Sequence, residues 1–388
     1  MTASILMFCP QFRPIVGGAE RQAEKLGKAL AQRGVRVTVL TPQLVADTAK
    51  HEENAGVVIH RFPLFDLCSR LPGVPSMGPL NLLLIRAQVL RAMNRYLDGI
   101  DVVHLHIAAP MTAFAMRGAR TKGIPVLCKV ANAGPPDDLH RLNEVGIGGN
   151  WLRRLMIRDL DCWIATTQAV RRSLLDWGVA ANRITMIPNG VDTDGGSVPR
   201  RRISGARRFL YLGRLSTGIQ RDVPTLVRAF DRLADQLPDA ELALVGDGNR
   251  FQETADVIAQ CHNRGCIQMP GLQKPDPWLQ WADCFVLPSR REGLSNALLE
   301  AMAHSLPCIA NDIPPNREVL DDGRAGILVP MGDEDRLYLE MMRMATESDH
   351  AHALGYAGLE RVRKCYSIEG VADRYIELYG DLTKSRCQ

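Results

Sequence analysis

Short apolar runs alternate with longer amphipathic stretches along this chain, and this alternation constrains its fold more than any other feature. Val102–Ile107, Val126–Val130 and Cys284–Leu287 are typical of the short runs, and Asp222–Gln236 is typical of the amphipathic stretches. Many short runs are apolar on both faces, which predicts strands covered by helices on both sides. The chain is therefore expected to have an α/β fold built from parallel βαβ units.

A turn-rich and charged stretch divides the chain into two series of predicted strands. Residues 195–199 contain two glycines and a proline, and three arginines follow at 200–202. Such a stretch is typical of a linker, and a chain of 388 residues is long enough for two domains that each bury a core. We expect an N-terminal domain over residues 1–198 and a C-terminal domain over residues 199–366.

Composition excludes several classes of protein. The 47 basic and 43 acidic residues leave a net charge of +4, which is too small to indicate a nucleic-acid partner. No secretory signal and no membrane-spanning run is evident. The ten cysteines include no C-x-x-C pair, which favours reduced thiols and a cytoplasmic location. Zinc binding by Cys261, His262 and Cys266 would lack a second ligand pair, so we expect no metal.

The segment after the predicted strand Cys284–Leu287 is the richest in chemistry. Glu292 lies in a glycine-containing loop, a helix begins near Ser295, and Glu300 lies more than a turn inside it. The free amides of Leu294 and Ser295 would bind an anion. Carboxylates on either side could accept hydrogen bonds from vicinal hydroxyls, which suits a sugar nucleotide. A capping loop followed by a surface glutamate explains the segment equally well.

Two arginines of the same half could neutralise a diphosphate. Arg214 follows a predicted strand directly, and Arg221 precedes the next helix. A guanidinium matches phosphate oxygens, although ordinary surface arginines are the alternative. Gly246 begins a glycine loop after another strand, but Phe251 stands where a dinucleotide-binding loop has its third glycine. The sequence therefore does not favour an NAD-dependent enzyme.

Two features of the N-terminal half could also face a ligand. Gly17 and Gly18 lie where a strand leads into a helix, so their amides could approach an anion; a plain tight turn is the alternative. His104 and His106 share one face of the predicted strand Val102–Ile107. His106 is nearer the carboxyl end, where open α/β sheets bind ligands, whereas His104 is more typical of a core residue.

In this order, the motifs resemble those of glycosyltransferase family 4, whose members are retaining enzymes with the GT-B fold. The resemblance covers essentially the whole chain, and its most specific part is the pair Glu292 and Glu300 in an E-x7-E block. It implies two Rossmann-like domains facing a cleft, with a last helix within residues 367–388 that crosses back to the N-terminal domain. The other landmarks are Gly17-Gly18, Asp101 to His106, Ile187 to Asp192, Gly213 to Leu215, Val245 to Gly248, Ala282-Asp283, Pro288-Ser289 and Asn316 to Val319.

The resemblance also implies roles for single residues. Glu292 would contact the hydroxyls of the donor sugar, Arg214 would neutralise the diphosphate, and His106 would reach toward the transferred sugar. The family commonly has a lysine shortly after Gly-Arg-Leu, whereas residues 216–220 contain none. Arg221 is the best candidate for its role, and Gln220 and the amides of this loop are the alternatives. The expected donor-binding set is Gly17, Gly18, Arg214, Arg221, Gly246, Leu294, Ser295 and Glu300.

The activity implied is a retaining hexosyl transfer from a nucleoside-diphosphate sugar, a UDP- or GDP-sugar, with no metal and no cofactor besides this co-substrate. The acceptor would be a glycan, a lipid-linked molecule or a small molecule, in cell-surface polysaccharide or glycoconjugate biosynthesis. One alternative is a catalytically silent nucleotide- or carbohydrate-binding module on the same scaffold. Another is a GT-B epimerase or phosphorylase.

Two basic amphipathic segments bear on the acceptor side. Leu80–Leu97 has an apolar face and three arginines, and Trp151–Leu155 combines a tryptophan with two more. Both suit peripheral docking on the anionic inner face of a cell membrane. Ordinary amphipathic domain helices explain them equally well.

Overall fold

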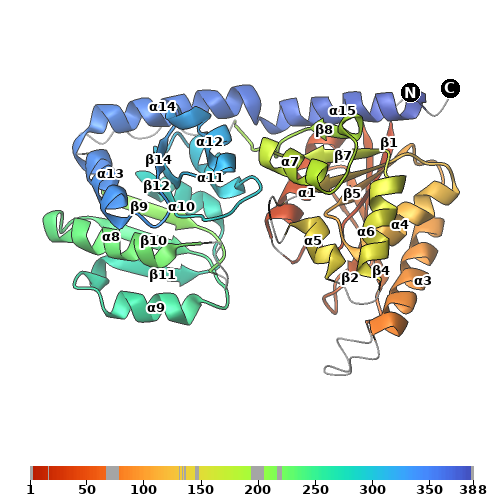
Figure 1. Cartoon of the computed structure of the whole chain (residues 1–388), viewed down its shortest axis with the longest axis horizontal. Helices are drawn as coiled ribbons and strands as arrows, with labels where there is room; N and C mark the ends of the chain where they lie inside the picture. The colour runs from red at the N-terminus through yellow and green to blue at the C-terminus, as the bar shows by residue number, and fades with distance from the viewer. Residues whose placement is uncertain are drawn as a thin grey trace. The chain divides into compact units, whose positions relative to one another are not determined.

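The computed structural model divides into two compact units (Figure 1). The first comprises Met1–Gly190 with Ile368–Gln388, and the second comprises Val191–Ser367. The structure describes residues 3–15, 17–66, 78–130, 132, 134, 137–144, 148–193, 205–215 and 221–385.

The first unit is built on an eight-stranded sheet with the order β3-β4-β2-β1-β5-β6-β7-β8. All neighbouring strands are parallel except the edge strand β3, which is antiparallel to β4. The central strands β1, β5 and β6 are buried along their whole length, as the two-sided apolar runs predict. The strands are β1 (Ser4–Phe8), β2 (Arg36–Gln43), β3 (His51–Asn54), β4 (Val57–Pro63), β5 (Val102–His106), β6 (Val126–Val130), β7 (Cys162–Ala165) and β8 (Ile184–Met186).

Helices cover both faces of this sheet. One core lies beneath α3 to α7, and the opposite core lies beneath α1 and α15. The returning segment therefore contributes to the hydrophobic core of the first unit. The helices are α1 (Gly18–Gln32), α3 (Gly78–Tyr96), α4 (Pro110–Thr121), α5 (Asp138–Asn143), α6 (Gly149–Asp159), α7 (Gln168–Asp176), the short η2 (Ala181–Arg183) and α15 (Ile368–Ser385).

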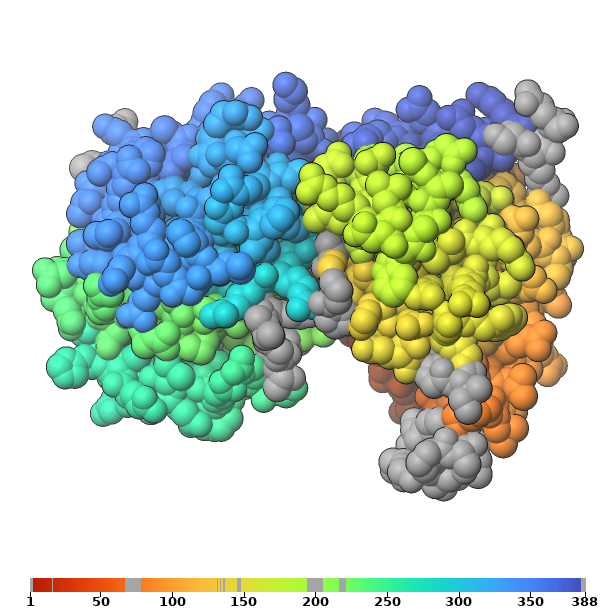
Figure 2. Space-filling model, viewed as in Figure 1, coloured from red at the N-terminus to blue at the C-terminus, as the bar shows by residue number. Residues whose placement is uncertain are grey.

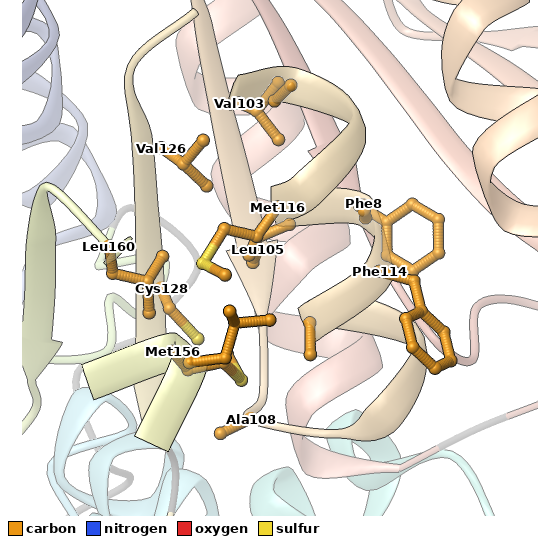
Figure 3. Close-up of a cluster of buried hydrophobic side chains, with 14 of the residues drawn as sticks. Phe8, Val103, Leu105, Ala108, Phe114, Met116, Val126, Cys128, Met156 and Leu160 are labelled. Atoms are coloured by element: carbon orange, nitrogen blue, oxygen red, sulfur yellow. The ribbon is translucent and has the colours of Figure 1, made fainter. Parts of the chain in front are cut away.

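The pleat of β5 and β6 assigns their side chains to these two cores. In Figure 3, Val103 and Leu105 of β5 and Val126 and Cys128 of β6 lie in the cluster beneath α4 and α6. Because successive side chains of a strand point to opposite faces, the alternate residues of both strands face α1 and α15. His104, His106 and Lys129 are among those alternate residues.

The second unit has a six-stranded, wholly parallel sheet with the order β11-β10-β9-β12-β13-β14. One core lies beneath α8, α9 and α13, and the other beneath α10, α11 and α14. The elements are β9 (Arg208–Leu212), α8 (Val223–Gln236), β10 (Glu241–Val245), α9 (Phe251–Ala259), η3 (Arg264–Cys266), β11 (Ile267–Gly271), α10 (Pro275–Trp281), β12 (Cys284–Leu287), α11 (Asn296–Ala303), β13 (Cys308–Asn311), α12 (Pro314–Val319), η4 (Asp321–Gly323), β14 (Ile327–Val329), α13 (Glu334–Thr346) and α14 (Ser348–Cys365).

The border between the units differs from the boundary expected at residue 198. Val191 is buried in the core of the second unit, and its N–H donates to the Tyr366 carbonyl over 2.9 Å. Ser367 pairs with Val191 in an isolated bridge, so the returning helix begins at Ile368. The linker predicted over residues 195–202 lies outside the described residues.

Candidate functional site

The donor residues expected in the second unit lie at the point where its sheet reverses its winding. β10 and β11 lie on one side of β9, and β12 to β14 lie on the other. Open α/β sheets bind ligands at the carboxyl ends of the strands at such a point. β9 ends at Leu212, just before Arg214, and its neighbour β12 ends at Leu287, just before the loop that contains Glu292.

Arg221, Ser289 and Glu292 form a hydrogen-bonded cluster at these strand ends. The Arg221 Nη1 donates to Ser289 Oγ over 2.6 Å and forms an ion pair with Glu292 Oε1. Ser289 Oγ donates to the same Glu292 oxygen over 2.9 Å. Burial alone would lower the pKa of Arg221, but its interactions with Glu292 and Tyr211 together outweigh burial, and the pKa is raised. Two residues expected on different parts of the donor are thus paired with each other.

Tyr211 is a member of this cluster that the sequence analysis missed. Its hydroxyl donates to the Arg214 carbonyl over 3.2 Å, and the side chain is fully buried. Burial raises its pKa to about 12, opposed in part by the nearby Arg221. The phenol therefore remains a proton donor at neutral pH. In the sequence, Tyr211 reads as one more apolar residue of a buried strand.

A second ion pair fixes the loops around the cluster. Arg290 donates from Nε and Nη2 to Asp222 Oδ2 over 3.1 and 2.6 Å. Asp222 Oδ1 accepts from Thr225 Oγ1 over 2.9 Å, and the Asp222 N–H donates to the Pro288 carbonyl over 2.7 Å. The segment before α8 is therefore held against the segment after β12, which positions Arg221 beside Glu292.

Arg214 differs from Arg221 and Arg290 because its guanidinium forms no hydrogen bond or ion pair with another described residue. It is exposed at the end of β9, and within the described part of the chain its side chain has no hydrogen-bond or ion-pair partner. An exposed, unpaired guanidinium at the carboxyl end of a central strand is well suited to bind phosphate.

Gly246 supports the loop that carries Arg214. A Cβ atom on Gly246 would lie 1.8 Å from the Gly213 carbonyl oxygen, so no other residue fits without moving the backbone. The neighbouring Leu215 N–H donates to the Asp247 carbonyl over 3.0 Å. These contacts give Gly246 a packing reason that is independent of its expected contact with a donor.

The start of α11 has the predicted capping geometry. Ser295 is the N-cap residue, and its Oγ accepts from the Leu298 N–H over 3.4 Å. Leu294 is buried against the core, and Glu300 is half-buried one turn inside the helix. Glu292 and Glu300 therefore lie on either side of a helix N-terminus, where backbone amides favour an anion.

In the first unit, the sheet reverses its winding between β1 and β5. Gly17 caps α1 and Gly18 begins it, and both have accessible surface. His104 is wholly buried and its Nδ1 lies 2.8 Å from the Tyr379 hydroxyl of α15, which confirms it as a core residue. Its ring stacks on that of His106 with centroids 4.3 Å apart.

His106 is 4% exposed, and its Nε2 has no hydrogen-bond partner among the described residues. Burial lowers the pKa of His106 to about 3, and the neighbouring Lys129 contributes to the shift. The imidazole is therefore neutral at physiological pH. It can offer a hydrogen bond to a sugar hydroxyl without carrying a charge of its own.

Lys129 is the second residue that the sequence analysis missed. It is the register partner of His106 on β6 and is only 7% exposed. Burial lowers its pKa to about 7. Within the residues that the structure describes, its amino group has no hydrogen-bond or ion-pair partner. A lysine near the carboxyl end of an otherwise apolar predicted strand was the signal that could have identified it.

Metal ligation has no clear candidate in the described part of the chain. No group of three or more His, Cys, Asp or Glu side chains there is arranged to hold an ion. Cys261 instead donates from Sγ to the Val257 carbonyl over 3.5 Å.

Known proteins share both the sequence family and the fold of this chain. A family model described as Glycosyltransferase Family 4 matches residues 16–195, and one described as Glycosyl transferases group 1 matches residues 206–347. A phosphatidyl-myo-inositol mannosyltransferase from Mycobacterium leprae is 26% identical, covering 98% of this chain and 97% of its own length.

Solved structures extend the likeness to the fold. A sucrose-phosphate synthase from Thermosynechococcus elongatus has a TM-score of 0.78 and 19% identity, and it covers 99% of this chain and 100% of that one. The Anabaena protein HepE, solved with UDP-glucose, has a TM-score of 0.75 and 15% identity, with 97% and 99% covered. The family and the fold that the sequence predicts are confirmed. With two family matches that together span most of its length, this chain belongs to the family 4 glycosyltransferases and is a sugar-transferring enzyme of the GT-B fold.

Proposed function

We propose that this enzyme transfers a hexosyl group from a nucleoside-diphosphate sugar to a glycan, lipid-linked or small-molecule acceptor, with retention of anomeric configuration. The observation that carries the proposal is the grouping of Arg214, Arg221 and Glu292 beside the N-terminus of α11 at the carboxyl ends of β9 and β12. These groups supply cations and amides for a diphosphate, and carboxylates for hydroxyls.

Two cations would stabilise the leaving nucleoside diphosphate. Negative charge grows on the bridging phosphate oxygen as the bond to the anomeric carbon breaks, and Arg214, which has no side-chain partner among the residues that the structure describes, can neutralise that charge. We assign Arg221 the role of the family's lysine, since it keeps a positive charge while Glu292 orients it. In a front-face route, the acceptor oxygen bonds to the anomeric carbon on the side that the phosphate leaves. The departing phosphate takes the acceptor's proton.

The pairing of Arg221 with Glu292 has a consequence for donor binding. A carboxylate that accepts from a guanidinium and from Ser289 retains lone pairs for sugar hydroxyls. Glu292 can therefore bind the donor sugar without releasing Arg221. Glu300, one turn inside α11, is the group we assign to the ribose.

Relatives support a UDP-sugar as the first donor to test and a membrane lipid as one acceptor class. HepE was solved with UDP-glucose, and the Mycobacterium leprae relative is named for phosphatidyl-myo-inositol. We assign this enzyme to cell-surface polysaccharide or glycoconjugate biosynthesis, with a UDP- or GDP-sugar as donor and no metal or other cofactor.

A surface patch on the first unit supports docking on an anionic bilayer. Leu83 of α3 and Trp151 of α6 are each 58% exposed, and α3 carries three arginines but no acidic residue. Figure 2 shows α3 at the surface of this unit, and a Cβ on Gly148 would lie 3.2 Å from Leu82, so α3 adjoins the start of α6. Exposed apolar groups beside uncompensated arginines suit an anionic membrane surface. No helix in the described part of the chain has the length and hydropathy to span a membrane.

Vesicle flotation tests the docking. The wild type should float with phosphatidylglycerol vesicles at low salt, and replacement of Leu83 and Trp151 by Glu should abolish flotation. Tyr356→Glu in the second unit, where Tyr356 is 65% exposed, is the matched control. Wild-type protein that stays unbound would rule out this docking.

Donor hydrolysis and nucleotide binding test the activity itself. Incubation with UDP-glucose, UDP-N-acetylglucosamine and GDP-mannose should release nucleotide from at least one donor, and anomeric NMR of the sugar product should show retention. Glu300→Ala should weaken binding of the free nucleotide about tenfold, as loss of a charged hydrogen bond predicts. Nucleotide binding without turnover of any donor would instead favour the silent binding module.

A further inference from the structure

His106 and Lys129 form a buried pair at the carboxyl ends of β5 and β6. They are directly opposite each other in the register and lie on the face of the sheet beneath α1 and α15. His106 is 4% exposed and Lys129 is 7% exposed. The pair lies next to the point where the sheet reverses its winding, which is where ligands of such sheets bind.

Nothing around Lys129 in the described chain compensates for its burial. The titratable groups on this face are His104 and His106 of β5, Cys9 beyond β1, Cys162 of β7, and Tyr375 and Tyr379 of α15. Burial lowers the pKa of both histidines and raises those of the two thiols and the phenols, so all six are neutral at pH 7. Glu20 of α1 acts on Cys9, whereas burial alone shifts the pKa of Lys129.

A lysine in such a place destabilises the fold. Lysines are almost never fully buried without a partner, because the charged form loses hydration and the neutral form keeps an unsatisfied amine. An apolar side chain of similar length would fit the strand better. Residues that break a folding rule in this way are expected at functional sites.

We propose that Lys129, together with His106, binds an anionic substituent, a carboxylate or a phosphate, on a sugar that this enzyme handles. The proposal rests on the proposed function and narrows it to charged substrates. The anion could belong to the donor, as in a uronic acid, or to the acceptor, as in a sugar phosphate. In either case the ammonium of Lys129 would neutralise the anion, and a ring nitrogen of His106 would donate a hydrogen bond to the anion or to a neighbouring hydroxyl.

Lys129→Met is the decisive variant, because methionine keeps the length and removes the charge. Lys122→Met is the control, since Lys122 pairs with Asp98 at the surface of the same unit. In the donor arm, hydrolysis of UDP-glucuronate is compared with that of UDP-glucose. In the acceptor arm, transfer to glucose 1-phosphate is compared with transfer to methyl glucoside, using whichever donor the wild type turns over.

We expect the wild type to favour the charged sugar in one arm and Lys129→Met to lose about 100-fold in kcat/KM there, as loss of a charged contact predicts. The neutral sugar should change less than about threefold. The arm that responds identifies whether donor or acceptor carries the anion. Equal charged-to-neutral ratios for wild type and Lys129→Met in both arms would overturn the proposal.

Proton uptake gives a readout that does not depend on turnover. Near pH 8 much of Lys129 is neutral, because its pKa is about 7. Binding of the charged sugar should therefore take up close to one proton in the wild type and none in Lys129→Met. Calorimetry in two buffers of different ionisation enthalpy measures this number. A wild type that binds UDP but takes up no proton with either charged sugar contradicts the proposal, whereas failure to bind any nucleotide contradicts the proposed function.

Discussion

Both units have basic residues at the carboxyl ends of their sheet strands, but the surroundings of these residues differ between the units. In the second unit, Arg221 is paired with Glu292, and Arg214 is exposed with no side-chain partner among the described residues. In the first unit, Lys129 and His106 are buried among neutral groups, and no carboxylate of the described residues pairs with either side chain. The second unit therefore maintains charge by pairing and by exposure, which suits the diphosphate site that we propose, whereas the first suppresses charge by burial.

Among the variants that test this contrast, Arg214→Ala has the largest expected effect. Removal of this cation, which has no side-chain partner in the described part of the chain, should lower kcat about 100- to 1000-fold, the range found when one donor to a developing anion is deleted. The fold should be unchanged because the side chain has no partner among the described residues. Steady-state donor turnover measures the effect, with the exposed Arg363→Ala on α14 as control. Wild-type turnover in Arg214→Ala would remove Arg214 from the site.

Glu292→Gln tests the compensation within the second unit. The substitution leaves Arg221 largely buried without its carboxylate, so the free energy of unfolding should fall by about 2 to 3 kcal/mol. Urea denaturation followed by tryptophan fluorescence measures the loss. Glu360→Gln on α14, which pairs with Arg363 at the surface, should cost less than about 0.5 kcal/mol. Equal losses would show that the Arg221–Glu292 pair contributes no more to the free energy of unfolding than an exposed ion pair does.

The pH dependence of stability tests the suppression of charge in the first unit. Burial lowers the pKa of Lys129 from 10.5 to about 7, so between these values the unfolded chain binds more protons than the folded one. Stability should therefore rise with pH from 7 toward 9, by about 2 kcal/mol for one such group. Thermal unfolding at several pH values should show the rise in wild type and in Lys122→Met. A rise of the same size in Lys129→Met would exclude Lys129 as its source.

His106 predicts that the same rise of stability with pH extends to the acid side of the profile. Its pKa falls from 6.5 to about 3, so the unfolded state binds more protons below pH 6.5 and stability should decrease as the pH falls toward 3. His104 shifts in the same direction and adds to the decrease.

The smallest expected effect concerns the contact between the returning helix and β5. Tyr379→Phe removes the hydroxyl that lies 2.8 Å from His104 Nδ1 and leaves that nitrogen buried without its partner. The free energy of unfolding should fall by about 1 kcal/mol. Urea denaturation measures it, and Tyr356→Phe at the surface is the control. No change in Tyr379→Phe would mean that ring packing alone holds α15 on β5.

The sequence predicts the strands of both units well because both-sided burial leaves a strong pattern. The runs at Val126–Val130, Glu241–Val245 and Cys284–Leu287 coincide with β6, β10 and β12. The edge strand β3 was missed because His51–Asn54 is polar and only half-buried. The unit border was misplaced by a few residues because Val191 is held by Tyr366, a contact distant in the sequence.

The site was only partly predictable from the sequence, because some of its contacts join residues that are distant in the sequence. Ser295 and Arg214 could be placed because each follows a strand or caps a helix locally. The pairing of Arg221 with Glu292 could not, since it depends on two loops meeting across the sheet. Lys129 was hidden because a single lysine in an apolar strand is equally compatible with an edge position.

The return of α15 to the first unit matters for how the chain is made. Tyr375 and Tyr379 complete the core beneath α1 and contact His104, yet the ribosome synthesises them only after the whole second unit. During translation the hydrophobic core of the first unit therefore stays incomplete until α15 is synthesised, whereas the second unit can fold as soon as it has emerged from the ribosome. A chain released early, before Ile368, would leave apolar surface exposed on the first unit and become a substrate for chaperones and proteases. The returning helix thus links the integrity of the N-terminal half to complete translation.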